Sequence, residues 1–531
     1  MARECEMEQL TPDLGANACL ALAHVCARHG QRTALYLPDL GSDAKLSYAQ
    51  FYQAVGNAAA ALNRLGIKRD DRLVLCLDVE PHALILVFAC AYLGATAVLV
   101  GNRLSQEEMH YIVHDAAPSM IITSLDDLGL FAGDLRVSKV VVAALGEETG
   151  KWPVFPGLNE LTATQGACAD MASVAADHPA LILYTSGTTS KPKGVVISHA
   201  HLVWSAQSNI EHLQVTENDV TLVFFPLCHT MAFSYQVLTS LYSGGAMVLR
   251  RVFNPQRFWD DAARFACTWA AILPFVCHAL AALETPSRHS FRFWGFPSRN
   301  TDVEALFGVK TVGWWGMTEL FAIGSLTSEQ RSADINYSIG KPVSGYCYRL
   351  ADAVANAGPF NARISADLQL HAQPGKTLFL GYLNKPDETR EAFTEDGWYI
   401  TGDRFFENAE GVLFFDVRLK DIIKVGGENV SASEIEFAAY ASAMISEVAV
   451  VSRPDPLLTE VPVLFAVLNA DGREDQGLAR QRIEQACRER LADFKRPHEI
   501  IFLLDFPRAG LRKIAKNQLR QMAGQQAREP A

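Results

Sequence analysis

The sequence predicts an α/β protein, with a large amino-terminal domain of layered α/β sheets and a small α+β carboxyl-terminal domain. Two observations lead to this prediction. Short apolar runs alternate with helical patterns through the first four hundred residues, and a separate compact unit follows them. A chain of 531 residues also exceeds what one hydrophobic core usually supports, so two or more domains are expected.

The apolar runs have the length and composition of buried strands. Strands are expected at Arg72–Leu77, Met120–Thr123, Lys139–Val142 and Val220–Phe225. The segments between them have helical patterns, and Tyr48–Leu65 carries the Ala-rich apolar face of a helix. This alternation favours helices layered over largely parallel, buried sheets.

One apolar stretch has to be distinguished from a membrane span. Residues His82–Val100 are almost uninterrupted apolar sequence, close to the roughly 20 residues that cross a bilayer. Gly94 divides the stretch into an Ala/Leu-rich half and a Val-rich half. We therefore expect a buried helix, a glycine turn and a buried parallel strand, and no membrane span.

Composition narrows the class of protein further. A net charge of -12 argues against a broad nucleic-acid-binding face, which is built from Lys and Arg. The 11 cysteines show no CxxC pair and no zinc-like spacing, which suits reduced thiols in a cytoplasmic protein. Glu4, Glu6 and Glu8 do not fit the positive start of a secretory signal peptide.

The second unit begins near Arg418, and we expect domains at residues 1–419 and 420–531. A glycine-rich turn at Gly426 and Gly427 opens it, and a helix follows from Ser433. Further elements are expected in this order: strands at Glu447–Ser452 and Val463–Leu468, a long helix at Glu474–Phe494 and a strand at Ile500–Leu504. This unit has the size of a small α+β domain.

The most informative stretch is Leu181–His199. An apolar strand is followed by a hydroxyl-rich loop and two lysines, then by a second apolar run; the loop residues are Thr185, Ser186, Gly187, Thr188, Thr189 and Ser190, and the lysines are Lys191 and Lys193. Small residues let backbone N–H groups turn toward an anion, and the hydroxyls and lysines add donors and charge. A polyphosphate fits this composition. The loop joins two strands, unlike the P-loop, and the alternative interpretation is a polar hairpin turn with incidental lysines.

The loop TSGTTSKPKG resembles the signature of the adenylate-forming superfamily, which includes acyl-CoA synthetases, aryl-CoA ligases and adenylation domains of peptide synthetases. Ser190 stands where the family usually has Gly. Further motifs follow in the family's order over nearly the whole chain, and they are most similar to those of acyl-CoA ligases. The resemblance implies the fold of these enzymes and the cofactors ATP, Mg²⁺ and CoA.

The resemblance also implies site residues. Thr185, Ser186, Gly187, Thr188, Thr189 and Lys193 would hold phosphates. His229, in Phe225-Pro226-Leu227-Cys228-His229, would border the acyl pocket. In Trp315-Gly316-Met317-Thr318-Glu319, Trp315 would stack on adenine, Thr318 would touch the α-phosphate and Glu319 would hold Mg²⁺. Asp403 would accept hydrogen bonds from the ribose hydroxyls, with support from Arg418.

The remaining implied residues lie in the second unit. Lys420 matches the hinge between the domains, and Gly426 and Gly427, in the run Gly426–Asn429, match a segment that lines the CoA channel. Lys513 matches the lysine that promotes adenylation. Arg512 precedes it where the family normally has Gly, and the alternative is that Lys513 is one cation of a basic tail.

The acyl site departs from the family. Trp294, Gly295 and Phe296 occupy the place of a run of small residues, and Trp314 stands where Gly is common. Large rings there predict a short or compact acid. The alternative is that the rings point into the core and the pocket is built elsewhere.

The sequence thus predicts an enzyme that activates a small-molecule carboxylic acid as its adenylate and transfers the acyl group to CoA. Catalytic roles are expected for Lys513, Thr185, Glu319 and His229. Two alternatives stay open: an adenylating enzyme that loads a carrier protein or an amine, and a non-catalytic nucleotide-binding relative.

Overall fold

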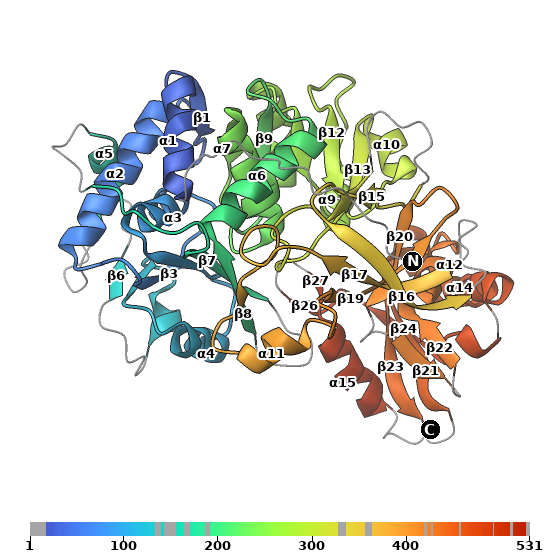
Figure 1. Ribbon diagram of the computed structural model, residues 1–531. Coiled ribbons are helices and arrows are strands. Elements are labelled where there is room, and N and C mark those ends of the chain that lie inside the picture. Colours follow the sequence, from blue (N-terminus) through green and yellow to red (C-terminus); the bar gives the residue numbers. More distant parts are fainter. Residues whose placement is uncertain are drawn as a thin grey trace.

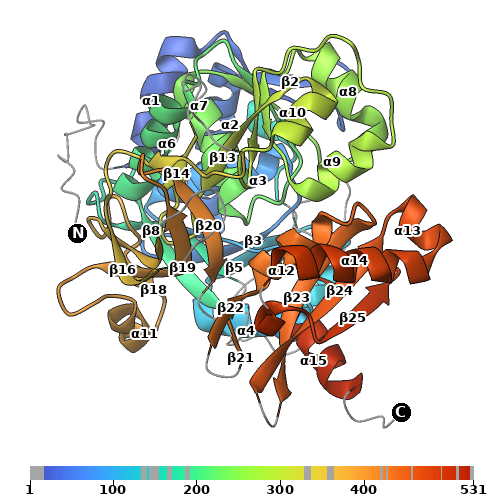
Figure 2. The same ribbon diagram turned by 90° about the vertical axis from the view of Figure 1, so that its right-hand side faces the viewer.

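The computed structural model describes residues 17–132, 140–142, 155–163, 170–185, 192–327, 336–355, 364–418, 422–425, 428–455, 458–491, 493–509 and 513–526. It has a large amino-terminal domain and a smaller carboxyl-terminal domain (Figures 1 and 2). The carboxyl-terminal elements, in orange and red, gather on one side of the larger part. The predicted fold class is therefore confirmed.

The first large sheet carries the predicted phosphate loop. Its strands lie in the order β18 (Gly381–Tyr382), β8 (Lys193–Ser198), β7 (Pro179–Thr185), β4 (Thr96–Leu99), β3 (Arg72–Cys76), β5 (Met120–Thr123) and β6 (Val140–Val142). The strands from β7 to β6 are parallel, whereas β8 pairs antiparallel with both β7 and β18.

The second large sheet carries the predicted acyl segment. Its strand order is β15 (Lys341–Pro342), β14 (Ser325–Leu326), β13 (Lys310–Trp315), β12 (Phe293–Phe296), β11 (Trp269–Ala271), β9 (Val220–Val223), β10 (Ala246–Leu249), β1 (Thr33–Tyr36) and β2 (Lys45–Ser47). The strands from β13 to β1 are parallel.

Two further sheets complete the chain. The first is antiparallel, with the order β16 (Cys347–Ala355), β17 (Ile364–His371), β19 (Tyr399–Glu407) and β20 (Leu413–Arg418). The carboxyl-terminal sheet has the order β22 (Glu428–Ser431), β21 (Ile422–Val425), β24 (Thr459–Leu468) and β23 (Ile445–Asp455), and β25 (Glu499–Leu503) pairs parallel with β24. A short ribbon joins β26 (Arg508–Ala509) to β27 (Lys513–Ile514).

Helices cover these sheets. In the larger part they are α1 (Ala18–His29), α2 (Tyr48–Arg64), α3 (Pro81–Leu93), α4 (Gln106–Ala116), α5 (Leu158–Thr162), α6 (His199–Leu213), α7 (Thr239–Ser243), α8 (Pro255–Arg264), α9 (Pro274–Ala281), α10 (Thr301–Phe307) and α11 (Pro386–Glu391), with a 3₁₀ turn η1 (Leu128–Phe131) and a π-helix η2 (Met231–Leu238). In the smaller domain they are α12 (Ala432–Tyr440), α13 (Ala470–Glu474), α14 (Gln476–Arg490) and α15 (Lys516–Gln526), with a 3₁₀ turn η5 (Asp493–Lys495).

The alternating side chains of the central strands explain the layers. On β3, Leu73 and Leu75 belong to the main core, and Val74 and Cys76 belong to a second core on the other face with Met109 of α4. Both faces of the parallel sheet are therefore buried, which is why its strands are apolar throughout.

The apolar stretch His82–Val100 forms the expected helix, turn and strand. Helix α3 is buried on nearly all sides and packs against α1, α2 and β4. Gly94 ends it in the left-handed region, at φ 71°, where glycine is favoured. In the part of the chain that the structure describes, no helix has the length and hydropathy that a bilayer-spanning helix needs.

The predicted long helix Glu474–Phe494 is wrong in one respect. The structure divides this segment between α13, which ends at Glu474, and α14, which begins at Gln476. Asp475 leaves the helical conformation, and its side chain accepts a hydrogen bond from the backbone N–H of Leu478. An aspartate placed before a helix favours such an N-cap over an uninterrupted helix.

Candidate active site

The predicted phosphate loop connects two antiparallel strands, as the sequence indicated. Thr185 ends β7 and lies opposite Lys193, which begins β8, and the Thr185 hydroxyl donates to the Lys193 carbonyl at 3.5 Å. The residues between them, which include Ser186, Gly187, Thr188 and Thr189, lie outside the described part of the chain. The hairpin places the two ends of the loop side by side.

Lys193 meets Glu319 through a tyrosine that sequence reasoning missed. Tyr382 on β18 pairs with Val195 of β8, and the Lys193 Nζ lies 4.7 Å from the centroid of the Tyr382 ring. The Tyr382 hydroxyl donates to Glu319 Oε1 at 2.7 Å. Burial and the Glu319 charge raise the pKa of Tyr382 well above its ordinary value, so this phenol stays protonated.

A second contact joins the Trp315 motif to the Asp403 motif. The Trp315 indole Nε1 donates to Asp403 Oδ2 at 2.8 Å, and both side chains are buried. The two residues lie on β13 and β19, which belong to different sheets. Arg418 on β20 lies opposite Asp403 in the antiparallel register. Thr318 is half-buried in the turn that follows β13.

The two tryptophans of the predicted acyl site, Trp294 on β12 and Trp314 on β13, face different surroundings. Trp294 is fully buried in an aromatic cluster with Phe258, Trp259, Phe291 and Phe307. Its ring therefore belongs to the core.

Trp314 lies on the other side of this segment. A Cβ atom at Gly295 would overlap the Trp314 ring, so the ring covers the bare backbone of β12. Trp314 also makes an edge-on contact with Tyr235, with ring centroids 5.5 Å apart. Phe296, at the end of β12, is buried. Of the two tryptophans, Trp314 is therefore the one that could narrow an acyl pocket, because Trp294 packs in the core.

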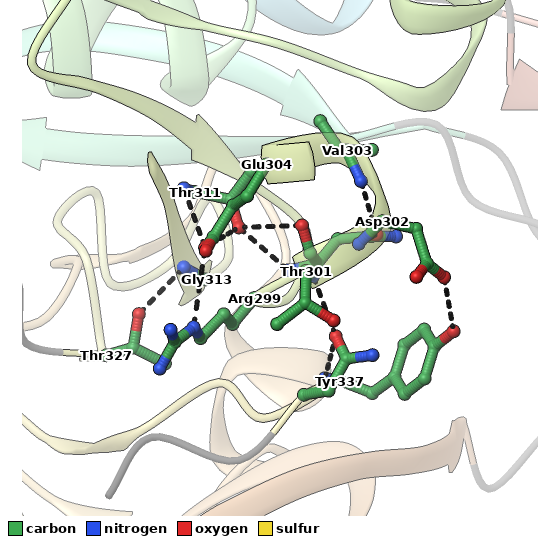
Figure 3. A network of polar contacts seen from close by, with 11 residues as sticks. Arg299, Thr301, Asp302, Val303, Glu304, Thr311, Gly313, Thr327 and Tyr337 are labelled. Carbon is green, nitrogen blue, oxygen red and sulfur yellow. Dashed lines mark hydrogen bonds and ion pairs between the residues drawn. The ribbon is translucent and has the colours of Figure 1, made fainter. Parts of the chain in front are cut away.

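A polar network joins helix α10 and the loop before it to β13, the strand that carries Trp314 (Figure 3). The Glu304 carboxylate on α10 accepts from the backbone N–H of Thr311 at 3.0 Å, from the Thr311 hydroxyl at 2.8 Å and from Arg299 Nε at 3.3 Å. The Thr327 hydroxyl accepts from the backbone N–H of Gly313 at 2.9 Å. These bonds connect the loop after β12 and helix α10 to the body of β13.

His229 occupies the turn after β9. Its side chain is half-buried, and its carbonyl accepts from the backbone N–H groups of Ala232 and Phe233, which lie in the first turn of η2. The four residues before it, Phe225 to Cys228, line a cavity of about 320 Å³ together with Asn102, Arg103 and Arg251. His229 thus lies next to this cavity in sequence.

Several predicted residues of the second unit cannot be placed against the site. Lys420, Gly426 and Gly427 lie outside the described residues. Lys513 begins β27 and pairs with Ala509 of β26, but only its backbone is described. Their roles stay predictions.

The residues present fit the implied magnesium ion. Among the described residues, no three His, Cys, Asp or Glu side chains converge as metal ligands, so Glu319 would be a single protein carboxylate. One carboxylate joined by substrate phosphate oxygens is an ordinary donor set for Mg²⁺. The Glu319 carboxylate, which is buried and accepts a hydrogen bond from Tyr382, suits that role.

Two protein-family models match the sequence of this chain. The profile of AMP-binding enzymes covers residues 22–362, more than half of the chain, and that of the AMP-binding enzyme C-terminal domain covers residues 434–513. The chain belongs to the AMP-binding enzyme family. The resemblance to the adenylate-forming superfamily is thereby confirmed.

Individual relatives of this AMP-binding enzyme are CoA ligases. A crotonobetaine/carnitine–CoA ligase of Salmonella enteritidis PT4 is 28% identical over 509 residues, covering 93% of this chain and 96% of the ligase. The anthranilate CoA ligase AuaEII, solved with anthranoyl-AMP, has a TM-score of 0.84 at 26% identity, covering 97% of this chain and 99% of that chain. ATP-bound MatB from Rhodopseudomonas palustris shares the fold, with a TM-score of 0.81 at 23% identity, covering 95% and 99%. The AMP-binding enzyme is accordingly of the AMP-forming acid–thiol ligase class.

Proposed function

We propose that this AMP-binding enzyme activates a compact carboxylic acid with ATP and transfers the acyl group to CoA, in the cytoplasm. In the first step a carboxylate oxygen bonds to the α-phosphorus, the bond from that phosphorus to the bridging oxygen breaks, and pyrophosphate leaves. In the second step a thiolate sulfur bonds to the acyl carbon, the bond to the AMP oxygen breaks, and AMP leaves. The observation that supports this proposal is that the structure brings predicted motif residues together in two pairs. Tyr382 joins Lys193 to Glu319, and Trp315 donates a hydrogen bond to Asp403.

The protein's task in the first step is positioning and charge stabilisation. We assign the β- and γ-phosphates to the loop of Thr185, Ser186, Gly187, Thr188 and Thr189 and to Lys193. Thr318 contacts the α-phosphate, the Trp315 ring faces adenine, and Asp403 with Arg418 binds the ribose. Mg²⁺ held by Glu319 supplies positive charge to the phosphate oxygens.

Lys513 completes the adenylation site in this proposal. A compact ammonium group can lie between the carboxylate and the α-phosphate and neutralise the charge that develops there. Residues 420–531 act as the mobile domain, and a rotation at Lys420 removes Lys513 before the second step. Gly426 and Gly427 then line the path of the thiol.

CoA is favoured as the acceptor for two reasons. The run Gly426–Asn429 resembles CoA ligases, and the named relatives are CoA ligases. A carrier-protein thiol or an amine is the competing acceptor, because the first step is the same for all three.

We assign the acid to a short or compact class. Trp314 lies over Gly295 and against Tyr235, so a large ring fills the space beside the bare backbone of β12. Phe296 and His229 complete the proposed pocket. Crotonobetaine, carnitine and anthranilate, the acids named for the relatives, are small as well.

A pyrophosphate-release screen tests the whole proposal. The purified enzyme is supplied with ATP, Mg²⁺ and a panel of acids, with and without CoA, and the products are identified by mass. We expect release with C2–C6 or aryl acids and an acyl-CoA product. Faster turnover of palmitate would refute the compact-acid assignment. Nucleotide binding without any acid-dependent ATP–pyrophosphate exchange would instead establish a non-catalytic relative.

A further inference from the structure

Tyr382 occupies the point where the phosphate hairpin meets the carboxylate of Glu319. Its ring lies beside Lys193, and its hydroxyl donates to Glu319 Oε1. Backbone pairing places the ring beside Lys193: Tyr382 on β18 lies opposite Val195, which is two residues beyond Lys193 on β8. Since successive residues of a strand face opposite sides, Lys193 and Val195 share a face.

The tyrosine is itself held firmly. Its ring packs at 4.9 Å from that of Phe379, and its backbone N–H donates to the Thr389 hydroxyl at 2.9 Å. The Glu319 carbonyl accepts from the backbone N–H of Phe379 at 2.9 Å. Residues 319 and 379 to 382 therefore form one packed unit, although about sixty residues separate them.

We propose that Tyr382 is a positioning residue that orients the Glu319 carboxylate for the divalent cation and the Lys193 ammonium for the phosphates. This inference rests on the function proposed above. A carboxylate has about four lone-pair sites, so one phenolic donor fixes its rotation and leaves sites for a cation. The ring face favours an ammonium ion beside it and restricts where Lys193 can point.

The two contacts of Tyr382 have separable consequences. The hydroxyl acts on Glu319 and therefore on metal-bound nucleotide. The ring acts on Lys193 and therefore on nucleotide with or without metal. Tyr382→Phe removes the hydroxyl, which bonds to Glu319 and also to the Tyr399 hydroxyl, but keeps the ring beside Lys193, whereas Tyr382→Leu removes both contacts.

The experiment measures binding rather than turnover. Dissociation constants for ATP are determined by calorimetry with Mn²⁺ and again with EDTA, for the wild type, Tyr382→Phe and Tyr382→Leu. For Tyr382→Phe we expect Mn²⁺·ATP to bind about tenfold more weakly, the lower end of the usual effect of residues that orient a metal ligand. Metal-free ATP keeps its affinity within about twofold, because the ring stays beside Lys193. Tyr382→Leu additionally weakens metal-free ATP by about two- to fivefold.

Tyr346→Phe is the matched control. Its buried hydroxyl donates to the carbonyl of Leu320, the residue after Glu319, at 3.3 Å. Like Tyr382→Phe, this variant loses one phenolic oxygen. The bond that it loses goes to the residue next to Glu319 and does not involve the Glu319 carboxylate. We expect both of its dissociation constants to equal those of the wild type.

A double-mutant cycle with Glu319→Gln separates the coupling between Tyr382 and Glu319 from any general damage to the fold by either substitution. If the hydroxyl acts through the carboxylate, Tyr382→Phe costs no further affinity for Mn²⁺·ATP in the Glu319→Gln background. Equal additional losses in both backgrounds would overturn the inference, and so would unchanged Mn²⁺·ATP binding by Tyr382→Phe. A wild type that binds neither form of ATP would instead refute the proposed function.

Discussion

Replacing Trp315 by phenylalanine removes one hydrogen-bond donor while keeping an aromatic ring. The lost bond joins the indole Nε1 to Asp403 Oδ2 at 2.8 Å, and Asp403 is 2% exposed. Water cannot readily take the place of this donor at a carboxylate so deeply buried. We expect the hydrogen-bonded carboxylate to stabilise the fold and to hold Asp403 ready for the ribose.

The magnitude follows from the charge of the acceptor. A hydrogen bond to a charged group contributes about 1.5–3 kcal/mol. The free energy of unfolding of Trp315→Phe should fall by that amount beyond the loss of packing. If the same energy orients Asp403 toward the ribose hydroxyls, the preference for ATP over 3′-deoxy-ATP falls by about tenfold or more.

Trp294→Phe is the control for packing. Trp294 is also fully buried, but its Nε1 has no hydrogen-bond partner among the described residues. Both variants lose the same ring atoms, so their difference reports the bond to Asp403. Urea unfolding measures the two free energies, and calorimetry measures the nucleotide preference. Equal destabilisation of the two variants, with an unchanged preference for ATP, would refute the reasoning.

Three further outcomes are expected. Lys513→Ala should slow adenylate formation by about 100-fold or more, yet convert a supplied acyl-adenylate to thioester at nearly the wild-type rate. Mass analysis of the products measures both steps, and an equal loss of both would contradict the assignment. Trp314→Ala should cost about 3–5 kcal/mol of stability but raise kcat/KM roughly fifteenfold for acids two methylenes longer, at about 0.8 kcal/mol each; an unchanged acid profile would remove Trp314 from the pocket. Burial lowers the pKa of His201 to about 4, so the unfolded chain binds a proton that the folded chain does not, and stability falls as pH drops from 6.5 toward 4. His201→Gln should reduce that slope by up to about 1.4 kcal/mol per pH unit, and an equal slope in urea titrations at several pH values would contradict this.

Elements with a strong local sequence pattern formed where the sequence predicted them. The segment His82–Val100 forms α3, Gly94 and β4 because length, apolar composition and one glycine suffice to specify them. Met120–Thr123 forms β5 with the predicted bounds. The order of the motifs likewise identified the family, because the resemblance extends over nearly the whole chain.

Side-chain direction was the harder problem, and the acyl segment shows why. Strand alternation requires Trp294 and Gly295 to face opposite sides, so both cannot line one pocket. The same rule separates Trp314, which covers Gly295, from Trp315, which reaches Asp403. The periodicity was present in the sequence, but which side faces the site depends on how the sheets pack.

Tyr382 could not have been found from its own surroundings in the sequence. It lies in a short edge strand of two residues, and its partners Lys193 and Glu319 are far away along the chain. Long-range pairing of β18 with β8 creates the contact, and no local pattern specifies that pairing.

That pairing also sets the order in which the nascent chain can close its sheet. β8 ends at Ser198 and β18 begins at Gly381, so 182 residues (199 to 380) are synthesised between them. At about 5–20 residues per second, this interval lasts roughly 10 to 40 s. Throughout it, the outer edge of β8 has not yet received β18 and presents backbone groups to which other extended chains can bind. The hairpin that holds the phosphate loop therefore keeps an unpaired edge while this part of the chain is synthesised, and fragments truncated before Gly381 keep that edge open permanently.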